Sequence, residues 1–355
     1  MRRIVVHRPG GYDRLHIEQH DDLVPGHGEV LVDVEAIGVN YADCVTRMGL
    51  YASAKQYVGY PVTPGFEVAG RVAALGEGVT DLATGAEVIA VTRFNAYASH
   101  VVMKRVQVFP KPERLSMQQA AGFAAVFLTA WFALFELAHP RDGQAVLVHS
   151  AAGGVGGALV QLGNIAACRV VAVVGAAHKT DQVRRMGAIA VIDKSSEDLW
   201  KSAERTAPGG YDVILDANGV STLQQSYRHL APMGKLVVYG FHSMLPRKGG
   251  RPKRMRLLWD YVRTPRFSPF SLTTHNRSVL GFNLSFLFDR SELMCAAMGQ
   301  LTRWLEEDRV QPPVIRSYAF EQVARAHRDL ESGQTVGKLV LLCREGHRAR
   351  EAVLS

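Results

Sequence analysis

The strongest constraint in this 355-residue sequence is a glycine-rich turn between an apolar strand and a helix of small residues. The stretch Val146-Leu-Val-His-Ser-Ala-Ala-Gly-Gly-Val-Gly-Gly-Ala places Ala151, Gly153 and Gly156 at the three positions of a GxGxxG motif. Gly153 lets the backbone approach a pyrophosphate, Gly156 lets the helix pack closely on the strand, and the helix N-terminus attracts phosphate. A ligand-free strand–helix turn can carry the same glycines, but the flanking elements favour a dinucleotide site.

Strands and helices alternate around this turn. Apolar strands are expected at 145–149, 169–174, 190–192, 211–216 and 234–239, with helices at 156–167 and 179–186. Apolar strands separated by helices predict a parallel sheet covered on both faces, and right-handed crossovers make it doubly wound. The sequence therefore predicts an α/β Rossmann domain in its middle.

The first 120 residues have a different pattern. Short segments at 29–36, 68–74 and 87–91 read as strands separated by glycine turns, which predicts a β-rich barrel-like or sandwich-like module. Helices are expected at 117–139, 293–307 and 320–332, and a last strand at 338–343. Because one core rarely serves more than about 250–300 residues, we expect two domains.

The residues after the second Rossmann strand indicate which dinucleotide binds. An NAD site usually has an Asp or Glu about 20 residues beyond the glycine turn. Here Val174 is followed by Gly175 and Lys179 with no carboxylate between them. A 2′-phosphate needs room and a cation, which Gly175 and Lys179 supply, and Lys194 offers a second cation. NADPH is the expected cofactor, and the alternative for Lys179 is a solvated lysine.

The net charge of +8 is concentrated in one segment, residues 246–266. Its eight cations, against Asp260, are Arg247, Lys248, Arg251, Lys253, Arg254, Arg256, Arg263 and Arg266, which gives 8 − 1 = +7. Because the rest of the chain is nearly neutral, no nucleic-acid partner is expected. Apolar residues from Met255 to Val262 follow helical spacing, which predicts a short amphipathic helix. It is expected to act as a lid or dimer contact, with an anionic membrane surface as the alternative.

The four cysteines include no CxxC pair, which favours buried thiols in a reducing cytoplasm. No stretch of about 18 apolar residues predicts a transmembrane helix. We expect a cytoplasmic protein, with peripheral membrane association through the basic segment as the alternative.

Several further motifs resemble one known family. They are Gly38-Val-Asn-Tyr-Ala-Asp43, Gly49-Leu-Tyr51, Pro64-Gly-Phe-Glu-Val-Ala-Gly70, Ala151-Ala-Gly-Gly-Val-Gly156 and Gly337-Lys338. Together they resemble the quinone oxidoreductase branch of the medium-chain dehydrogenase/reductase superfamily. Within it, Tyr239-Gly-Phe-His-Ser, Thr264-Pro-Arg-Phe-Ser-Pro, Asn276-Arg-Ser-Val and Gly281-Phe-Asn-Leu-Ser-Phe-Leu-Phe-Asp-Arg resemble the synaptic vesicle membrane protein VAT-1 homologues.

The resemblance implies how the domains are divided. A GroES-like catalytic domain would comprise residues 1–121 and 282–355. A Rossmann domain at 122–281 would interrupt it and would carry a basic insertion at about 243–276. The cofactor would lie in a cleft between the two domains.

The resemblance also implies site residues. Asn40, Tyr51 and Asp43 would line the nicotinamide end of the cleft. The residues expected to contact or flank the cofactor are Ala151, Gly153, Gly154, Val155, Gly156, Gly175, Lys179, Lys194, Tyr239, Phe282, Asn283 and Lys338. Lys194 is a departure, since relatives often carry tyrosine near this position.

No metal is expected. Zinc-dependent relatives have a histidine where this chain has Phe66, and the four-cysteine zinc lobe is absent. Cys44 stands next to the usual ligand position, but one cysteine and Glu67 cannot build a zinc site.

The expected reaction is hydride transfer from NADPH to a quinone or an α,β-unsaturated carbonyl, because these acceptors are electrophilic without a Lewis acid. Asn40 or a backbone N–H would bind the acceptor oxygen. Tyr51 would stack on the acceptor, donate a proton in place of solvent, or simply pack in the wall. Asp43 would orient its neighbours or a cofactor ribose.

The family further implies a homodimer. Residues 236–239 are expected to form an exposed edge strand that pairs with its copy. The alternative function is that of a VAT-1-like membrane- or lipid-associated binding protein with weak or no reductase activity.

Overall fold

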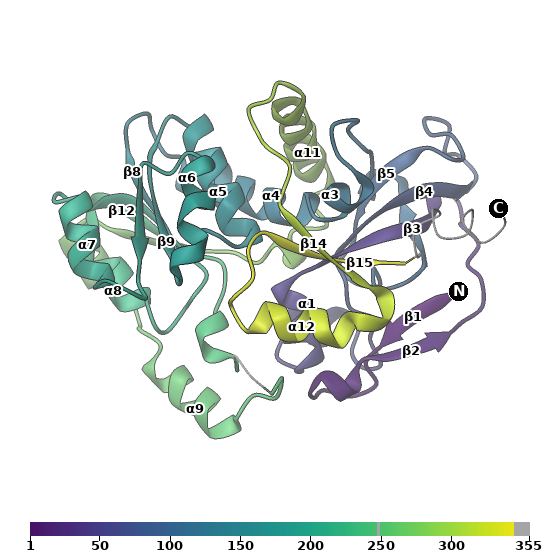
Figure 1. The fold of residues 1–355 in the computed structure, drawn as a ribbon, viewed down its shortest axis with the longest axis horizontal. Helices are drawn as coiled ribbons and strands as arrows, with labels where there is room; N and C mark the ends of the chain where they lie inside the picture. The colour runs from purple at the N-terminus through teal and green to yellow at the C-terminus, as the bar shows by residue number, and fades with distance from the viewer. Residues whose placement is uncertain (247–248, 344–355) are drawn as a thin grey trace.

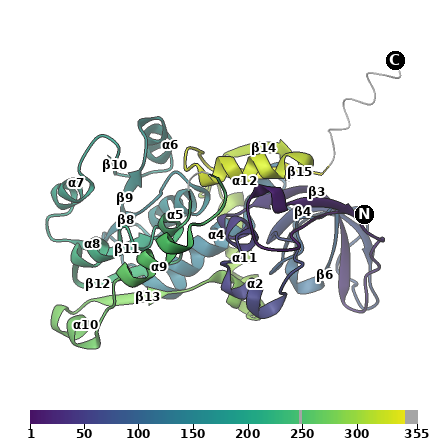
Figure 2. The same ribbon diagram turned by 90° about the horizontal axis from the view of Figure 1, so that it is seen from below.

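A computed structural model describes residues 1–246 and 249–343, which form two halves that lie side by side (Figures 1 and 2). One half is built on a six-stranded parallel sheet and the other on a larger, mainly antiparallel sheet. The expected combination of a GroES-like domain and a Rossmann domain is therefore confirmed.

The parallel sheet has the strand order β10-β9-β8-β11-β12-β13. Its strands are β8 (Ala145–Val148), β9 (Arg169–Val174), β10 (Ala190–Asp193), β11 (Tyr211–Asp216), β12 (Leu230–Val238) and β13 (Ser278–Gly281). The accompanying helices are α5 (Gly154–Ile165), α6 (Thr180–Arg185), α7 (Leu199–Thr206) and α8 (Leu223–Arg228). Alternate strand residues belong to two different apolar clusters, so both faces of the sheet are covered, as the continuous apolar strands predict.

The expected edge strand at residues 236–239 is wrong. Strand β12 has β11 on one side and β13 on the other, so its backbone is paired along both edges. The sheet continues to β13, whose four residues follow the basic insertion. Four residues are too few to show a periodic pattern in the sequence. The strand also lies far along the chain from β12, so the pairing of the two could not be predicted. The outer edge on this side is therefore β13.

The second sheet is centred on β3 (Glu29–Val39), which pairs antiparallel with β4 (Glu67–Leu75), β6 (His100–Lys104) and β15 (Lys338–Leu342). Its outer strands are β5 (Glu87–Val91), β7 (Val108–Pro110) and β14 (Ile315–Ala319). A separate hairpin pairs β1 (Arg2–Val5) with β2 (His16–Gln19). Because β14 and β15 follow the Rossmann strands in sequence, the chain crosses back to complete the sheet that it began.

The remaining helices connect or flank the two sheets. They are α1 (Tyr41–Arg47), α2 (Ala52–Tyr57), α3 (Met117–Ala121), α4 (Ala124–Trp131), α9 (Arg254–Arg263), α10 (Pro269–His275), α11 (Ser291–Glu306) and α12 (Val323–Glu331). The single helix expected at 117–139 is interrupted at Gly122, and its residues Phe132–Ala138 form a π-helix. Helix α9 confirms the helical spacing of the basic segment, although Arg247 and Lys248 lie outside the described residues.

A buried arginine ties three parts of the fold together. The Arg47 guanidinium, at the end of α1, bonds to Glu331 Oε1 at 2.8 Å and to His327 Nδ1 at 3.1 Å, both on α12. It also donates to the backbone carbonyl of Gly250 at 3.0 Å. Since a buried charge is tolerated only when it is paired, this contact anchors the start of the basic segment to the GroES-like half, which the resemblance makes the catalytic one and which is called the catalytic half below.

Two helical glycines give a paired test of the glycine turn. A Cβ on Gly156 would lie 2.3 Å from the Ser150 carbonyl oxygen, whereas one on Gly299 in α11 meets nothing within 4 Å. We expect Gly156→Ala to lower the free energy of unfolding by about 2 kcal/mol or more. Gly299→Ala should raise it by about 0.5–1 kcal/mol. Urea unfolding measures both, and an unchanged stability of Gly156→Ala would contradict the close helix–strand packing.

Candidate active site

The glycine turn has the geometry that a pyrophosphate requires. Strand β8 ends at Val148, and Gly153 is the N-cap of α5 without a side-chain capping bond. A Cβ on Gly153 would meet only the Ser150 carbonyl, at 3.4 Å, so its surroundings are open. The turn thus combines an uncapped twelve-residue helix with backbone that a phosphate can approach, and the dinucleotide fits it.

The three residues expected at the 2′-phosphate come together. Lys194 follows β10, and its Cε would lie 3.6 Å from a Cβ placed on Gly175, which follows β9. Lys179 is buried and is not a solvated lysine, because its Nζ donates to the Gly333 carbonyl oxygen at 2.6 Å. Burial, and then the charge of Lys194, lower the pKa of Lys179. The pair is therefore a concentrated positive site.

A buried ionic cluster lies directly beside the glycine turn. Lys338 Nζ is 2.7 Å from Glu67 Oε1 and also donates to Asn40 Oδ1. Asn40 Nδ2 in turn donates to Glu67 Oε1 at 3.1 Å. A Cβ on Gly154 would lie 3.5 Å from Lys338 Cδ, so the lysine passes between the two domains. Asn40 and Lys338, which the sequence assigned to separate roles, form one unit with Glu67.

Asp43 holds the loop that carries Asn40. Its Oδ2 accepts from the Asn40 backbone N–H at 2.7 Å and from the Tyr97 hydroxyl at 3.0 Å, and its Oδ1 accepts from the Gly65 N–H at 2.9 Å. The side chain is fully buried, and this burial raises the pKa of Asp43 to about 7. Of the two roles expected for Asp43, the geometry favours orientation of its neighbours.

Tyr51 and Asn283, two further residues expected at the site, contact each other. The Tyr51 hydroxyl donates to Asn283 Oδ1 at 2.9 Å, and its ring lies edge-on to Phe66 and Phe94. Burial raises the pKa of Tyr51, so the hydroxyl stays protonated at neutral pH. Phe282 instead stacks on Phe132, with ring centroids 6.5 Å apart. Tyr51 thus has both a packed ring and a polar hydroxyl.

Residues at the carboxyl ends of the central parallel strands form a further polar group. The Ser150 hydroxyl donates to Asn218 Oδ1 at 3.0 Å, and His242 Nε2 lies 2.8 Å from the same oxygen. The Tyr41 ring lies edge-on to the His242 ring, at 5.3 Å between centroids. Sequence reasoning named Tyr239 after β12 but missed these four residues. For Ser150, Asn218 and His242 the available signal was their position after strands of the parallel sheet, where doubly wound sheets bind ligands. Tyr41 follows β3 of the other sheet and carried no such signal.

One group of metal-type side chains comes together within residues 1–246 and 249–343: Cys44, His327 and Glu331. All three are buried inside the catalytic half. The Arg47 guanidinium already bonds to both His327 and Glu331. Because a cation would repel a metal ion there, this group fits an ion-pair network better than a metal centre.

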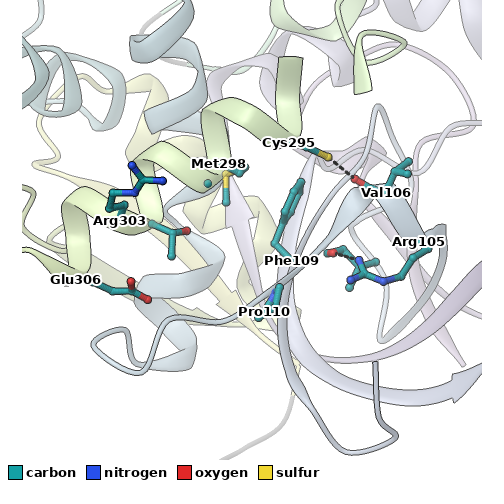
Figure 3. A pocket seen from close by; sticks show the side chains of 11 residues that line it. Arg105, Val106, Phe109, Pro110, Cys295, Met298, Arg303 and Glu306 are labelled. Carbon is teal, nitrogen blue, oxygen red and sulfur yellow. Dashed lines mark hydrogen bonds between the residues drawn. The ribbon is translucent and has the colours of Figure 1, made fainter. Parts of the chain in front are cut away.

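A cavity of about 470 Å³ lies elsewhere, between α11 and the segment that leads into β7 (Figure 3). Its lining includes Arg105, Phe109, Cys295, Met298 and Arg303. None of the residues expected at the cofactor or acceptor site lines it, so it is separate from the group of residues described above.

Comparisons with known proteins agree with this geometry. Residues 26–129 match the alcohol dehydrogenase GroES-like domain, and residues 186–341 match the zinc-binding dehydrogenase family. The chain is 33% identical over 351 residues to the synaptic vesicle membrane protein VAT-1 homolog of Rattus norvegicus, covering 96% of this chain and 84% of that protein.

Solved structures are similar over nearly the whole chain. The Escherichia coli quinone oxidoreductase complexed with NADPH superposes with a TM-score of 0.84 at 26% identity, covering 96% of this chain and 100% of that one. The CurK enoyl reductase superposes with a TM-score of 0.81 at 26% identity, covering 96% and 98%.

The Lys338–Glu67 pair yields a test of how β15 and β4 are coupled beside the glycine turn. Lys338→Met leaves the Glu67 carboxylate buried without its cation, so it should lower the free energy of unfolding by about 3–5 kcal/mol. Adding Glu67→Gln removes the stranded charge and should restore part of this loss. A double-mutant cycle by urea unfolding measures the coupling, and purely additive effects would show that the pair is not coupled.

Proposed function

The chain belongs to the medium-chain dehydrogenase/reductase superfamily of oxidoreductases, and from this premise we propose that it transfers hydride from NADPH, without zinc, to a quinone or an α,β-unsaturated carbonyl. The observation that carries the proposal is the Asn40–Lys338–Glu67 cluster beside the glycine turn. It brings catalytic-half side chains to the place where a dinucleotide would lie. The similarity to an NADPH-bound quinone oxidoreductase and to an enoyl reductase supports it.

The residues of this chain would hold the two ends of NADPH differently. The glycine turn would bind the pyrophosphate, and Lys179 with Lys194 would bind the 2′-phosphate beside Gly175. A lysine ammonium has three donors, so Lys179 can keep its bond to Gly333 while it binds phosphate. When bound, NADPH supplies the hydride from its nicotinamide ring.

The acceptor would lie between Asn40 and Tyr51. The Asn40 carboxamide has two N–H bonds, of which one is used by Glu67. The other makes a long contact with the Gly38 carbonyl oxygen, with 3.5 Å between Nδ2 and the oxygen. We propose that this second N–H bond binds the acceptor oxygen. Hydride addition to the β-carbon of an enone places negative charge on that oxygen, which the N–H stabilises. The Tyr51 hydroxyl, protonated at neutral pH, then donates the proton, with solvent as the alternative donor.

The surroundings of Phe66 support the zinc-free reaction. Phe66, where zinc-dependent relatives have a histidine, is 6% exposed and packs against Tyr51 and Phe94. Glu67, the neighbouring carboxylate, is engaged by Lys338, Asn40 and the Ala125 N–H. Phe66 offers no ligand atom, and the Glu67 carboxylate already accepts from three donors, so neither side chain is arranged to bind a metal ion.

We expect the purified protein to oxidise NADPH in the presence of simple quinones and enones, with kcat/KM for NADPH at least about tenfold above that for NADH. Lys179→Ala should reduce this preference, because it removes a cation from the 2′-phosphate site. Steady-state kinetics across an acceptor panel, with metal analysis of the same sample, measures both. Zinc should be well below one per chain.

The control is Lys201→Ala, which removes an exposed lysine from α7 and should leave the cofactor preference unchanged. Equal efficiency with NADH, or activity that disappears on chelation and returns with zinc, would overturn the proposal.

We also propose that the protein is a homodimer. Strand β13 has β12 on one side only, so its other edge is the place where a second copy would add a strand.

A second candidate function is binding to an anionic membrane surface through α9, in a cytoplasmic protein that attaches peripherally. The apolar residues of α9 share one helical face and are exposed to solvent, with Met255 79% and Trp259 62% exposed. Arg254, Arg256 and Arg263 lie on the same helix, which is at the lower edge of the molecule in Figure 1. No helix in the described residues has the length and apolar character to cross a bilayer. An exposed apolar face flanked by arginines is typical of interfacial helices.

Liposome cosedimentation tests this second candidate. Binding to vesicles that contain anionic lipid should weaken steeply as salt rises, since each basic residue contributes about 1 kcal/mol near the surface and salt screens this attraction. Charge reversal at Arg251, Lys253, Arg254 and Arg256 should abolish it without changing NADPH affinity. Reversing Arg184 and Arg185 on α6 is the control. If the α9 variant still binds vesicles but loses turnover, the segment acts as a lid.

A further inference from the structure

Asn218 is a buried amide with half of its hydrogen-bonding capacity unused. It follows β11 and is 4% exposed. Its Oδ1 accepts from the Ser150 hydroxyl, and because a carbonyl oxygen can only accept, the His242 ring N–H at 2.8 Å must be a donor. Its Nδ2 has no hydrogen-bond partner within the described part of the chain.

A buried donor without an acceptor costs free energy, and such groups are rare in folded proteins. Oδ1 is occupied by Ser150 and His242, so the N–H bonds of the amide lie on its other side, away from these two side chains. The arrangement is the one expected of a donor whose acceptor is a ligand.

The strand order indicates which part of the ligand this donor would meet. The glycine turn follows β8. Gly175 and Lys194 follow β9 and β10, on one side of β8, whereas Asn218 and His242 follow β11 and β12, on the other side. A dinucleotide whose pyrophosphate sits at the turn must extend to both sides. If its adenosine half lies over β9 and β10, its nicotinamide half lies over β11 and β12.

Contacts with the catalytic half agree with this direction. The Tyr41 ring packs on His242, and Tyr41 is the residue after Asn40. The Asn218 amide and the proposed acceptor site are therefore joined through Asn40, the N-cap of α1, and Tyr41, its first residue.

We propose that the Asn218 carboxamide is a positioning donor for the nicotinamide half of NADPH, bonding to an oxygen of its ribose or carboxamide, and that Ser150 and His242 orient it. This inference rests on the proposed cofactor. It assigns to Asn218 a role in placing the nicotinamide ring next to Asn40, distinct from the recognition of the 2′-phosphate by Lys179.

Calorimetric titration with whole and half cofactors tests the assignment. Asn218→Asp keeps the shape and the acceptor oxygen but removes the N–H donors, and Asn218→Leu removes them without adding charge. Both should weaken NADPH binding by about tenfold or more, the loss of a buried hydrogen bond. Both should leave the affinity for adenosine 2′,5′-bisphosphate, which has no nicotinamide half, within about twofold of the wild type.

The matched control is Asn164→Asp, the same substitution near the C-terminal end of α5, where the side chain donates to the Met186 carbonyl. It should change neither affinity, and melting temperatures of the unliganded variants confirm that each folds. If both Asn218 variants bind NADPH as the wild type does, or lose both ligands equally, the assignment is wrong while the cofactor proposal stands. If the wild type binds neither compound, the cofactor proposal itself fails.

Discussion

The Lys338 ammonium, shared between Glu67 and Asn40, is the contact on which the arrangement of the site depends. Lys338 begins β15, Glu67 begins β4, and Asn40 caps α1, so one cation fixes three elements of the catalytic half. The same side chain lies against Gly154 of the dinucleotide turn. Because Lys338 and Glu67 belong to the same half, their ion pair fixes the lysine side chain in place, and the dinucleotide turn packs against a side chain that is already positioned.

The surrounding contacts extend this constraint along the cleft. Lys179 bonds to the Gly333 carbonyl at one end, and Tyr41 packs on His242 at the other. The Gly337 N–H donates to the Ala152 carbonyl between them at 2.9 Å. The catalytic half therefore contacts the Rossmann half at the residues proposed for the 2′-phosphate, the pyrophosphate and the nicotinamide. Cofactor binding and domain arrangement would thus depend on the same side chains.

Local patterns in the sequence were sufficient to predict the Rossmann strands and the glycine turn, because these depend on neighbouring residues. The apolar run at 169–174 and the turn at Gly153–Gly156 are examples. The interior position of β12 was missed because β13 lies beyond the long basic insertion. The grouping of Lys338 with Glu67 joins residues that are distant in sequence, and no spacing rule reports such a contact. Asn218 was missed because its significance lies in an absent partner, which only the packed structure reveals.

Direct hydride transfer without a metal is the central claim, and isotope tracing tests it most directly. NADPH deuterated at the transferred position of C4 would be mixed with a simple enone and metal-free protein, and the product examined by NMR and mass spectrometry. The account predicts deuterium at the carbon β to the carbonyl, ordinary hydrogen at the α-carbon, and a slower reaction than with unlabelled NADPH. Product without deuterium at the β-carbon, or product formed only after zinc is added, would contradict it.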